Sequence, residues 1–125
     1  MNLKTLSVIS LSLIVSAAAF AQSLQITFSP NKPRYARGET LTIVYTVRDA
    51  AGNRVVNAPL LAWRYIDSIT QYSTYPTAFT DGNGQVRIPY TITMDPNKDR
   101  IYYEGVAIAN GVATNQPSVR IPIGN

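Results

Sequence analysis

The stretch that decides the fold runs from residue 32 to residue 55 and reads KPRYARGETLTIVYTVRDAAGNRV. Its centre, from Thr40 to Arg48, alternates between large apolar or aromatic residues and mostly threonine. A period of two in residues of this kind predicts a β-strand. The turn-forming residues of 49–53 end the strand. One face is expected to carry Leu41, Ile43, Tyr45 and Val47, and the other Thr40, Thr42, Val44 and Thr46.

The same alternation recurs on both sides of this strand. Further strands are expected over 23–29, 55–66, 85–93, 101–109 and 112–123, with a bulge or a late start at Pro59. Asn110-Gly111 predicts a tight hairpin turn, because these residues tolerate positive φ. No helical periodicity follows residue 21. Six or seven short strands with regular turns predict an all-β, immunoglobulin-like antiparallel β-sandwich.

The first 21 residues have the layout of a secretory signal peptide. Lys4 precedes an apolar run over 6–15, and the small-residue site AFA ends at Ala21. Cleavage after Ala21 is expected to leave one domain, residues 22–125. A membrane anchor or a buried helix is the alternative, but a span takes about 20 apolar residues. The domain is therefore expected to be secreted or periplasmic, with no membrane span after the leader.

The composition disfavours most catalytic and metal chemistry. The chain has no His and no Cys, the usual ligands of zinc and of iron–sulfur centres, and His is also the commonest general base. Without Lys4, ten basic residues remain against seven acidic ones, a net charge of +3. These charges are scattered and form no basic stripe of the kind that nucleic-acid binders show. We expect no enzyme, no cofactor and no nucleic-acid partner.

Two turn motifs resemble those of a known family. VRDAAGNRV at 47–55 and TDGNGQV at 80–86 resemble the turns of bacterial immunoglobulin-like domains of the invasin and intimin type. The segment KPRYARGET at 32–40 is similar to the entry of macroglobulin-type domains. Both families are β-sandwiches, so the resemblance implies that fold over most of the chain after the leader. The motifs are turns and strand edges, and they imply no activity.

A third resemblance lies in residues 99–105. Asp99, Ile101, Tyr103 and Gly105 are similar in spacing to the D-x-A-x-Y-x-C pattern of immunoglobulin strand F. The resemblance implies that Tyr103 hydrogen-bonds to upstream backbone as a corner tyrosine. It also implies that Trp63 packs in the core over Gly105. The alternative for Trp63 is a ring that stacks on a ligand.

This register leaves two details open. Val106 and Ile108 would face outward, so either Gly105 is a bulge or these two residues belong to an apolar contact surface. The phrase VRIP occurs at 86–89 and again at 119–122. Proline cannot donate to a β-ladder, so both of these strands are expected at sheet edges.

One short segment has the spacing of a calcium loop. Asp95, Asn97 and Asp99 follow the D-x-N-x-D pattern, but Arg100 stands where the loop needs Gly. An ordinary polar turn is the favoured interpretation.

The candidate binding surface is the segment 67–76, which reads DSITQYSTYP. Tyr, Ser and Thr are the residues that binding loops use for contact area and adaptable hydrogen bonds. Neighbouring strands could add to this surface if their side chains point outward. The alternative is an edge strand with ordinary surface tyrosines. The candidate residues are Arg64, Ile69, Tyr72, Tyr75 and Tyr102.

Two classes of function fit these expectations. The first is a secreted, non-enzymatic binding or adhesion-type module of a bacterial envelope or extracellular space, with a protein or glycan ligand. The second is a structural subunit of a surface assembly in which strands such as 23–29 pair between copies. Self-association is compatible with either class.

Overall fold

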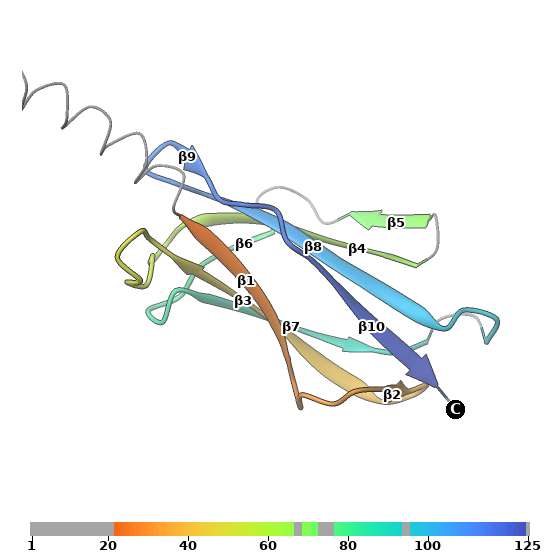
Figure 1. Ribbon diagram of the computed structural model, residues 1–125. Coiled ribbons are helices and arrows are strands. Elements are labelled where there is room, and N and C mark those ends of the chain that lie inside the picture. Colours follow the sequence, from red (N-terminus) through yellow and green to blue (C-terminus); the bar gives the residue numbers. More distant parts are fainter. Residues whose placement is uncertain (1–21, 67–68, 73–76, 94–95, 125) are drawn as a thin grey trace, which may run out of the picture.

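The computed structural model describes residues 22–66, 69–72, 77–93 and 96–124, and over 69–72 it describes the backbone alone. The expected leader, residues 1–21, lies outside these ranges. The described residues form two β-sheets packed face to face (Figure 1). Within them, no helix combines the length and the apolar character that crossing a membrane requires.

The first sheet has three strands in the order β1-β3-β7. They are β1 (Ser23–Ser29), β3 (Thr40–Arg48) and β7 (Gln85–Thr91), and both pairings are antiparallel. The bounds of β1 and β3 are those that the sequence predicts. β7 lies at an edge of this sheet, as expected from Pro89.

The second sheet follows the order β2-β10-β8-β4-β5. Its strands are β2 (Tyr35–Ala36), β10 (Ser118–Gly124), β8 (Arg100–Ala109), β4 (Pro59–Ile66) and β5 (Ile69–Tyr72). Two further strands, β6 (Ala78–Phe79) and β9 (Val112–Ala113), pair with β4 and β8. Every pairing is antiparallel except that of β2 with β10, which is parallel. Apart from the two-residue strands β2, β6 and β9, seven strands of the described chain build the immunoglobulin-like sandwich, so the predicted fold class is confirmed.

Of the two alternatives at Pro59, the late start is the one observed, because β4 begins at that residue. β7 ends two residues earlier than expected, at Thr91, and β8 begins one residue earlier, at Arg100. The single strand expected over 112–123 is divided into β9 and β10. The division lies at Thr114, whose side chain accepts a hydrogen bond from Ala107 N at 3.1 Å and donates one to the carbonyl of Asn115 at 2.9 Å. The hairpin turn is confirmed, because Asn110 and Gly111 have φ of 52° and 77°. β10 was expected at a sheet edge. It lies at an edge only over its first residues, because β2 pairs with its last two described residues.

The core lies between the sheets and takes its largest contribution from β3. Leu41, Ile43, Tyr45 and Val47 are at most 1% exposed, which confirms the predicted buried face. Facing them on β8, Gly105 is so crowded that an added Cβ would lie 3.1 Å from the Tyr45 ring. Tyr45 therefore fills the space that the small Gly105 leaves.

Trp63, which we expected in this space, is not part of the core. The buried residues of β4 are Leu60, Ala62 and Ile66, so Trp63 points to the opposite side of the strand and is half-buried. Gly105 pairs directly with Ala62 in an unbroken ladder, which excludes a bulge at Gly105.

Tyr103 is buried as expected, but it is not a corner tyrosine. Among the described residues, its hydroxyl makes no hydrogen bond to upstream backbone. Burial raises the pKa of this hydroxyl, and the positive charge of Arg64 acts against the rise.

Two turns of the same construction close one end of the sandwich. In the first turn, Asp49 Oδ1 accepts hydrogen bonds from the backbone N of Ala51 and of Asn53, both at 2.9 Å. In the second, Asp81 Oδ1 accepts from the residues two and four positions later, at 2.8 and 3.0 Å. These bonds hold the pKa of Asp81 below its usual value. The fourth residue of each turn is a glycine with positive φ, 85° at Gly52 and 71° at Gly84. The two motifs at 47–55 and 80–86, which resemble turns of bacterial immunoglobulin-like domains, therefore share one turn geometry.

Candidate contact surface on the second sheet

The outer side of the second sheet carries a continuous set of large side chains. Alternation along β4 and β8 turns one residue in two into the core and the next outward. The inward residues of β8 are Ile101, Tyr103, Gly105, Ala107 and Ala109, which are all buried. The outward residues form what we call the outer face: Pro59, Leu61, Trp63 and Tyr65 on β4, and Tyr102, Glu104, Val106 and Ile108 on β8.

A fixed polar and aromatic group lies at the middle of the outer face. Trp63 pairs with Glu104 across the two strands, and Trp63 Nε1 donates a hydrogen bond to Glu104 Oε1 at 2.9 Å. The hydroxyl of Tyr65 lies 3.5 Å from the second carboxylate oxygen. Tyr65 also stacks on Tyr102, with ring centroids 4.9 Å apart and ring planes 13° apart. These contacts restrain three rings around one carboxylate.

The end of the outer face next to the β8–β9 turn is apolar. Ile108 is 39% exposed, and Phe79 of β6, which pairs with Pro59, is 53% exposed. Val56, 56% exposed, lies nearby in the segment that enters β4. Residues 55–59 and 108–110 line a hollow of about 150 Å³ at this end. Val106 and Ile108 face outward without a bulge at Gly105. The structure therefore supports the alternative in which both residues belong to an outward apolar surface.

The opposite end of the outer face is basic. Arg120 of β10 pairs with Tyr102, and Pro122 pairs with Arg100. Asp99 contacts Arg100, with Oδ1 and Nε 2.9 Å apart, and the pKa of Asp99 is held below its usual value first by this pairing and to a smaller extent by Arg120. The surface therefore changes from apolar through aromatic to positively charged along the strands.

The five candidate residues expected from the sequence do not form one surface. Tyr102 lies on the outer face, whereas Arg64 points between the sheets and places its guanidinium 3.9 Å above the ring of Tyr90. The backbone register places Ile69 opposite Ile66 and Tyr72 opposite Trp63. Tyr75, like most of the segment 67–76, lies outside the described residues.

The sequence did not point to Leu61, Tyr65 and Glu104 as surface residues, and it offered a ligand-stacking role for Trp63 only as the alternative to the core. The sequence did contain a sign of this surface, because six of the eight residues at 59–66 are Pro, Leu, Trp, Tyr or Ile, and they do not alternate with polar residues. When a strand is apolar on both sides, the side that faces away from the core is expected to contact something other than water. The resemblance to immunoglobulin strand F led instead to the prediction that Trp63 lies in the core.

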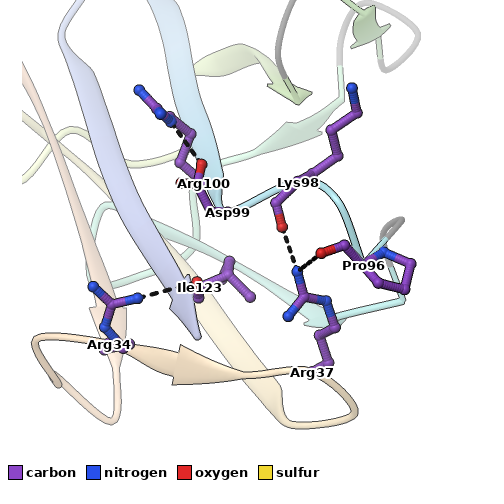
Figure 2. Close-up of polar contacts among 7 residues, drawn as sticks. All are labelled: Arg34, Arg37, Pro96, Lys98, Asp99, Arg100 and Ile123. Carbon is purple, nitrogen blue, oxygen red and sulfur yellow. Dashed lines mark hydrogen bonds and ion pairs between the residues drawn. The ribbon is translucent and has the colours of Figure 1, made fainter. Parts of the chain in front are cut away.

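The segment with calcium-loop spacing is built around an arginine (Figure 2). Arg37 donates hydrogen bonds to the carbonyl groups of Pro96, at 2.6 Å, and of Lys98. Asp99 forms an ion pair with Arg100, and Asp95 lies outside the described residues. Among those residues, no group of three metal-binding side chains occurs. The arrangement favours the interpretation as a polar turn.

Known proteins are similar to this chain in structure but not in sequence. No protein-family model and no curated protein matches it. One variant of superoxide reductase (neelaredoxin) from Ignicoccus hospitalis has a TM-score of 0.57 at 11% identity, over 89% of this chain and 87% of that chain. A second variant of the same protein has a TM-score of 0.55 at 11% identity, over 82% and 80%. The filamin domain of Lin-41 has a TM-score of 0.49 at 17% identity, over 79% and 91%.

At 11% identity, the likeness to superoxide reductase shows the fold alone. It extends over most of both chains, so it concerns the sandwich as a whole and not one of its sheets. Together with the observed strand order, it establishes an immunoglobulin-like β-sandwich domain.

Proposed function

We propose that this protein is a secreted, non-enzymatic binding module of a bacterial envelope or extracellular space, and that it binds through the outer face of β4 and β8. The observation that carries the proposal is the difference between the two outward sides of the sandwich. On the first sheet, the outward residues of β1 and β7 are polar or proline: Ser23, Gln25, Thr27, Ser29, Gln85, Arg87, Pro89 and Thr91. Those of the central strand β3 over 40–46 are three threonines and Val44, which is the one outward aliphatic residue of the three strands. That is the ordinary composition of a solvated sheet side.

The outer face of the second sheet has the composition of a contact surface. It carries one Trp, two Tyr, one Glu and four aliphatic or proline residues, with Arg at its border and no Lys. Protein contact surfaces are enriched in Trp, Tyr and Arg and depleted in Lys. Large apolar patches on soluble domains commonly mark binding sites.

The signal-peptide layout of residues 1–21 and the invasin-like turns support the proposed location and type of module. The sequence has no His and no Cys, whose imidazole and thiolate groups are the side chains that most often hold iron. Their absence supports a role that is not catalytic, and in particular a role that is not superoxide reduction.

A subunit that polymerises through strand pairing is less well supported. Pro89 and Arg87 on the edge strand β7 discourage pairing with another chain. The first half of β1 is tied to the far side of the sandwich, because Leu24 N donates to Asn115 Oδ1 at 2.7 Å. A single low-mass species in solution at high concentration would separate the module from the polymer.

The proposal predicts the effect of removing apolar side chains from the outer face. We expect the double substitution Leu61→Ser and Val106→Ser to weaken binding of labelled protein to envelopes of the source organism at least tenfold, about 1.4 kcal/mol. The matched control, Arg87→Ser with Thr91→Ser, changes the outer side of the first sheet and should bind like the parent. Circular dichroism would verify that both variants are folded. Equal binding by all three proteins would contradict the proposal.

A further inference from the structure

The middle of the outer face is a rigid aromatic platform. Trp63 is held by Glu104, and Tyr65 is held by Tyr102, through the 2.9 Å hydrogen bond and the 4.9 Å ring stacking. Restrained rings lose little conformational freedom when a ligand covers them, and this lowers the free-energy cost of binding. Flat rings on a sheet suit a ligand that offers flat C–H faces, as pyranose rings do.

Glu104 limits what can cover this platform. A carboxylate under an apolar protein patch would be desolvated without enough donors, which is costly. Its oxygens accept from Trp63 Nε1 and lie near the Tyr65 hydroxyl, and each oxygen can accept a further bond. A ligand rich in hydroxyl groups supplies such donors at every ring. The position of Glu104 therefore favours a sugar over an apolar protein surface.

A second copy of this chain is also a poor occupant. In a two-fold dimer whose axis runs along the strands and passes over β8, Glu104 would face the Glu104 of the partner. With strands reversed, the arginines at one end would face the apolar residues at the other end. Either arrangement places a charge without a compensating partner in the contact.

The ligand should carry negative charge. Six of the ten basic residues that follow position 21 lie in segments at one end of the sandwich: Lys32, Arg34, Arg37, Lys98, Arg100 and Arg120. Figure 2 shows four of these side chains at that end, where β2, β10 and the start of β8 meet. Within this group, Glu39 pairs with Lys32, and Asp99 pairs with Arg100. The resulting positive potential borders the aromatic platform and attracts anions.

We propose that the outer face binds an acidic glycan, with sugar rings on Trp63 and on the Tyr65–Tyr102 pair, hydroxyl groups on Glu104, and a carboxylate directed to Arg100 and Arg120. This inference rests on the proposed function and adds its ligand class. It requires the face as contact surface, but the proposed function does not require a glycan.

The single Trp of the chain lies in the site and reports on binding directly. The probes are an oligogalacturonate, an uncharged gluco-oligosaccharide and polyacrylate, each titrated into the protein while Trp63 fluorescence is recorded. We expect a saturable change with oligogalacturonate, binding at least tenfold weaker with the uncharged sugar, and no saturable change with polyacrylate. Added salt should weaken oligogalacturonate binding, because it screens the arginines.

Variants assign the contacts. Arg100→Ala with Arg120→Ala should weaken oligogalacturonate binding at least tenfold and leave the uncharged sugar unaffected, whereas Arg87→Ala on the other sheet should change neither. Tyr102→Ala should weaken both sugars. If it unfolds, Glu104→Gln provides the second variant, with weaker binding of both sugars expected because the carboxylate accepts stronger hydrogen bonds than an amide.

Two results would overturn the inference. One is a fluorescence response to polyacrylate equal to that for oligogalacturonate, which would show attraction by charge alone. The other is no response to any saccharide. If no saccharide binds while the Leu61 and Val106 substitutions still weaken envelope binding at least tenfold, the ligand class is wrong and the face binds a protein. If those substitutions have no effect either, the proposed function also fails.

Discussion

Tyr45→Ala is expected to lower the free energy of unfolding by about 3–5 kcal/mol, the range for large aromatic side chains removed from cores. Tyr45 is 1% exposed and packs where Gly105 leaves space on the facing strand. Urea unfolding of the parent and the variant measures the loss, and Tyr45→Phe, which keeps the ring, is the conservative control.

Trp63→Ala is the matched comparison, because tryptophan is larger than tyrosine but lies on the outer face. It removes one hydrogen bond, to Glu104, and a half-buried ring, so we expect a cost of only about 1–2 kcal/mol. A loss for Trp63→Ala as large as that for Tyr45→Ala would mean that the indole is part of the core and that the outer face is wrongly assigned.

Gly84→Ala is expected to destabilise the domain by about 1–3 kcal/mol more than Gly52→Ala, the range for an added methyl group in a packed site. Both glycines have positive φ in turns of the same construction, so both substitutions carry the backbone cost of a left-handed residue, about 1–2 kcal/mol. They differ in space. A Cβ on Gly52 would meet nothing within 4 Å, whereas on Gly84 it would lie 3.1 Å from both Val47 O and Val55 N.

Those two atoms form a hydrogen bond with each other, and Val47 N donates to the Gly84 carbonyl at 2.9 Å. A methyl group at Gly84 must therefore displace backbone that ties the two turns together, which costs as much as overpacking a core. Thermal and urea unfolding of the two variants isolates this steric difference. Equal destabilisation would show that the turns are not packed on each other as described.

The sequence was sufficient for the framework of the fold. Strict alternation over residues 40–48 identified the buried face of β3, because only one side of that strand carries large apolar residues throughout. The turns at 49–53 and 80–84 were also predictable, since Asp and Gly at these spacings satisfy backbone donors and supply positive φ. The parallel pair of β2 with β10 was not, because a two-residue strand has no periodicity to detect.

The candidate site was less predictable because β4 carries large apolar residues on both of its sides. Along 59–66, alternation alone cannot decide whether Trp63 or Ala62 points inward. The choice depends on the facing sheet, where Tyr45 already occupies the space beside Gly105. For the same reason, the prediction that Arg64 belongs to the binding surface was wrong: Arg64 packs on Tyr90, which belongs to the other sheet.

The outer face of β4 and β8 is a solvent-facing aromatic surface, and Trp63 tests this assignment most directly. Its fluorescence in the folded protein, titrated with the neutral quencher acrylamide, measures whether water-borne molecules reach the indole. We predict substantial quenching in the native state, with only a moderate further increase after unfolding in urea. An indole that is shielded from acrylamide until the protein unfolds would contradict the account, because Trp63 would then be buried and the outer face would have no platform.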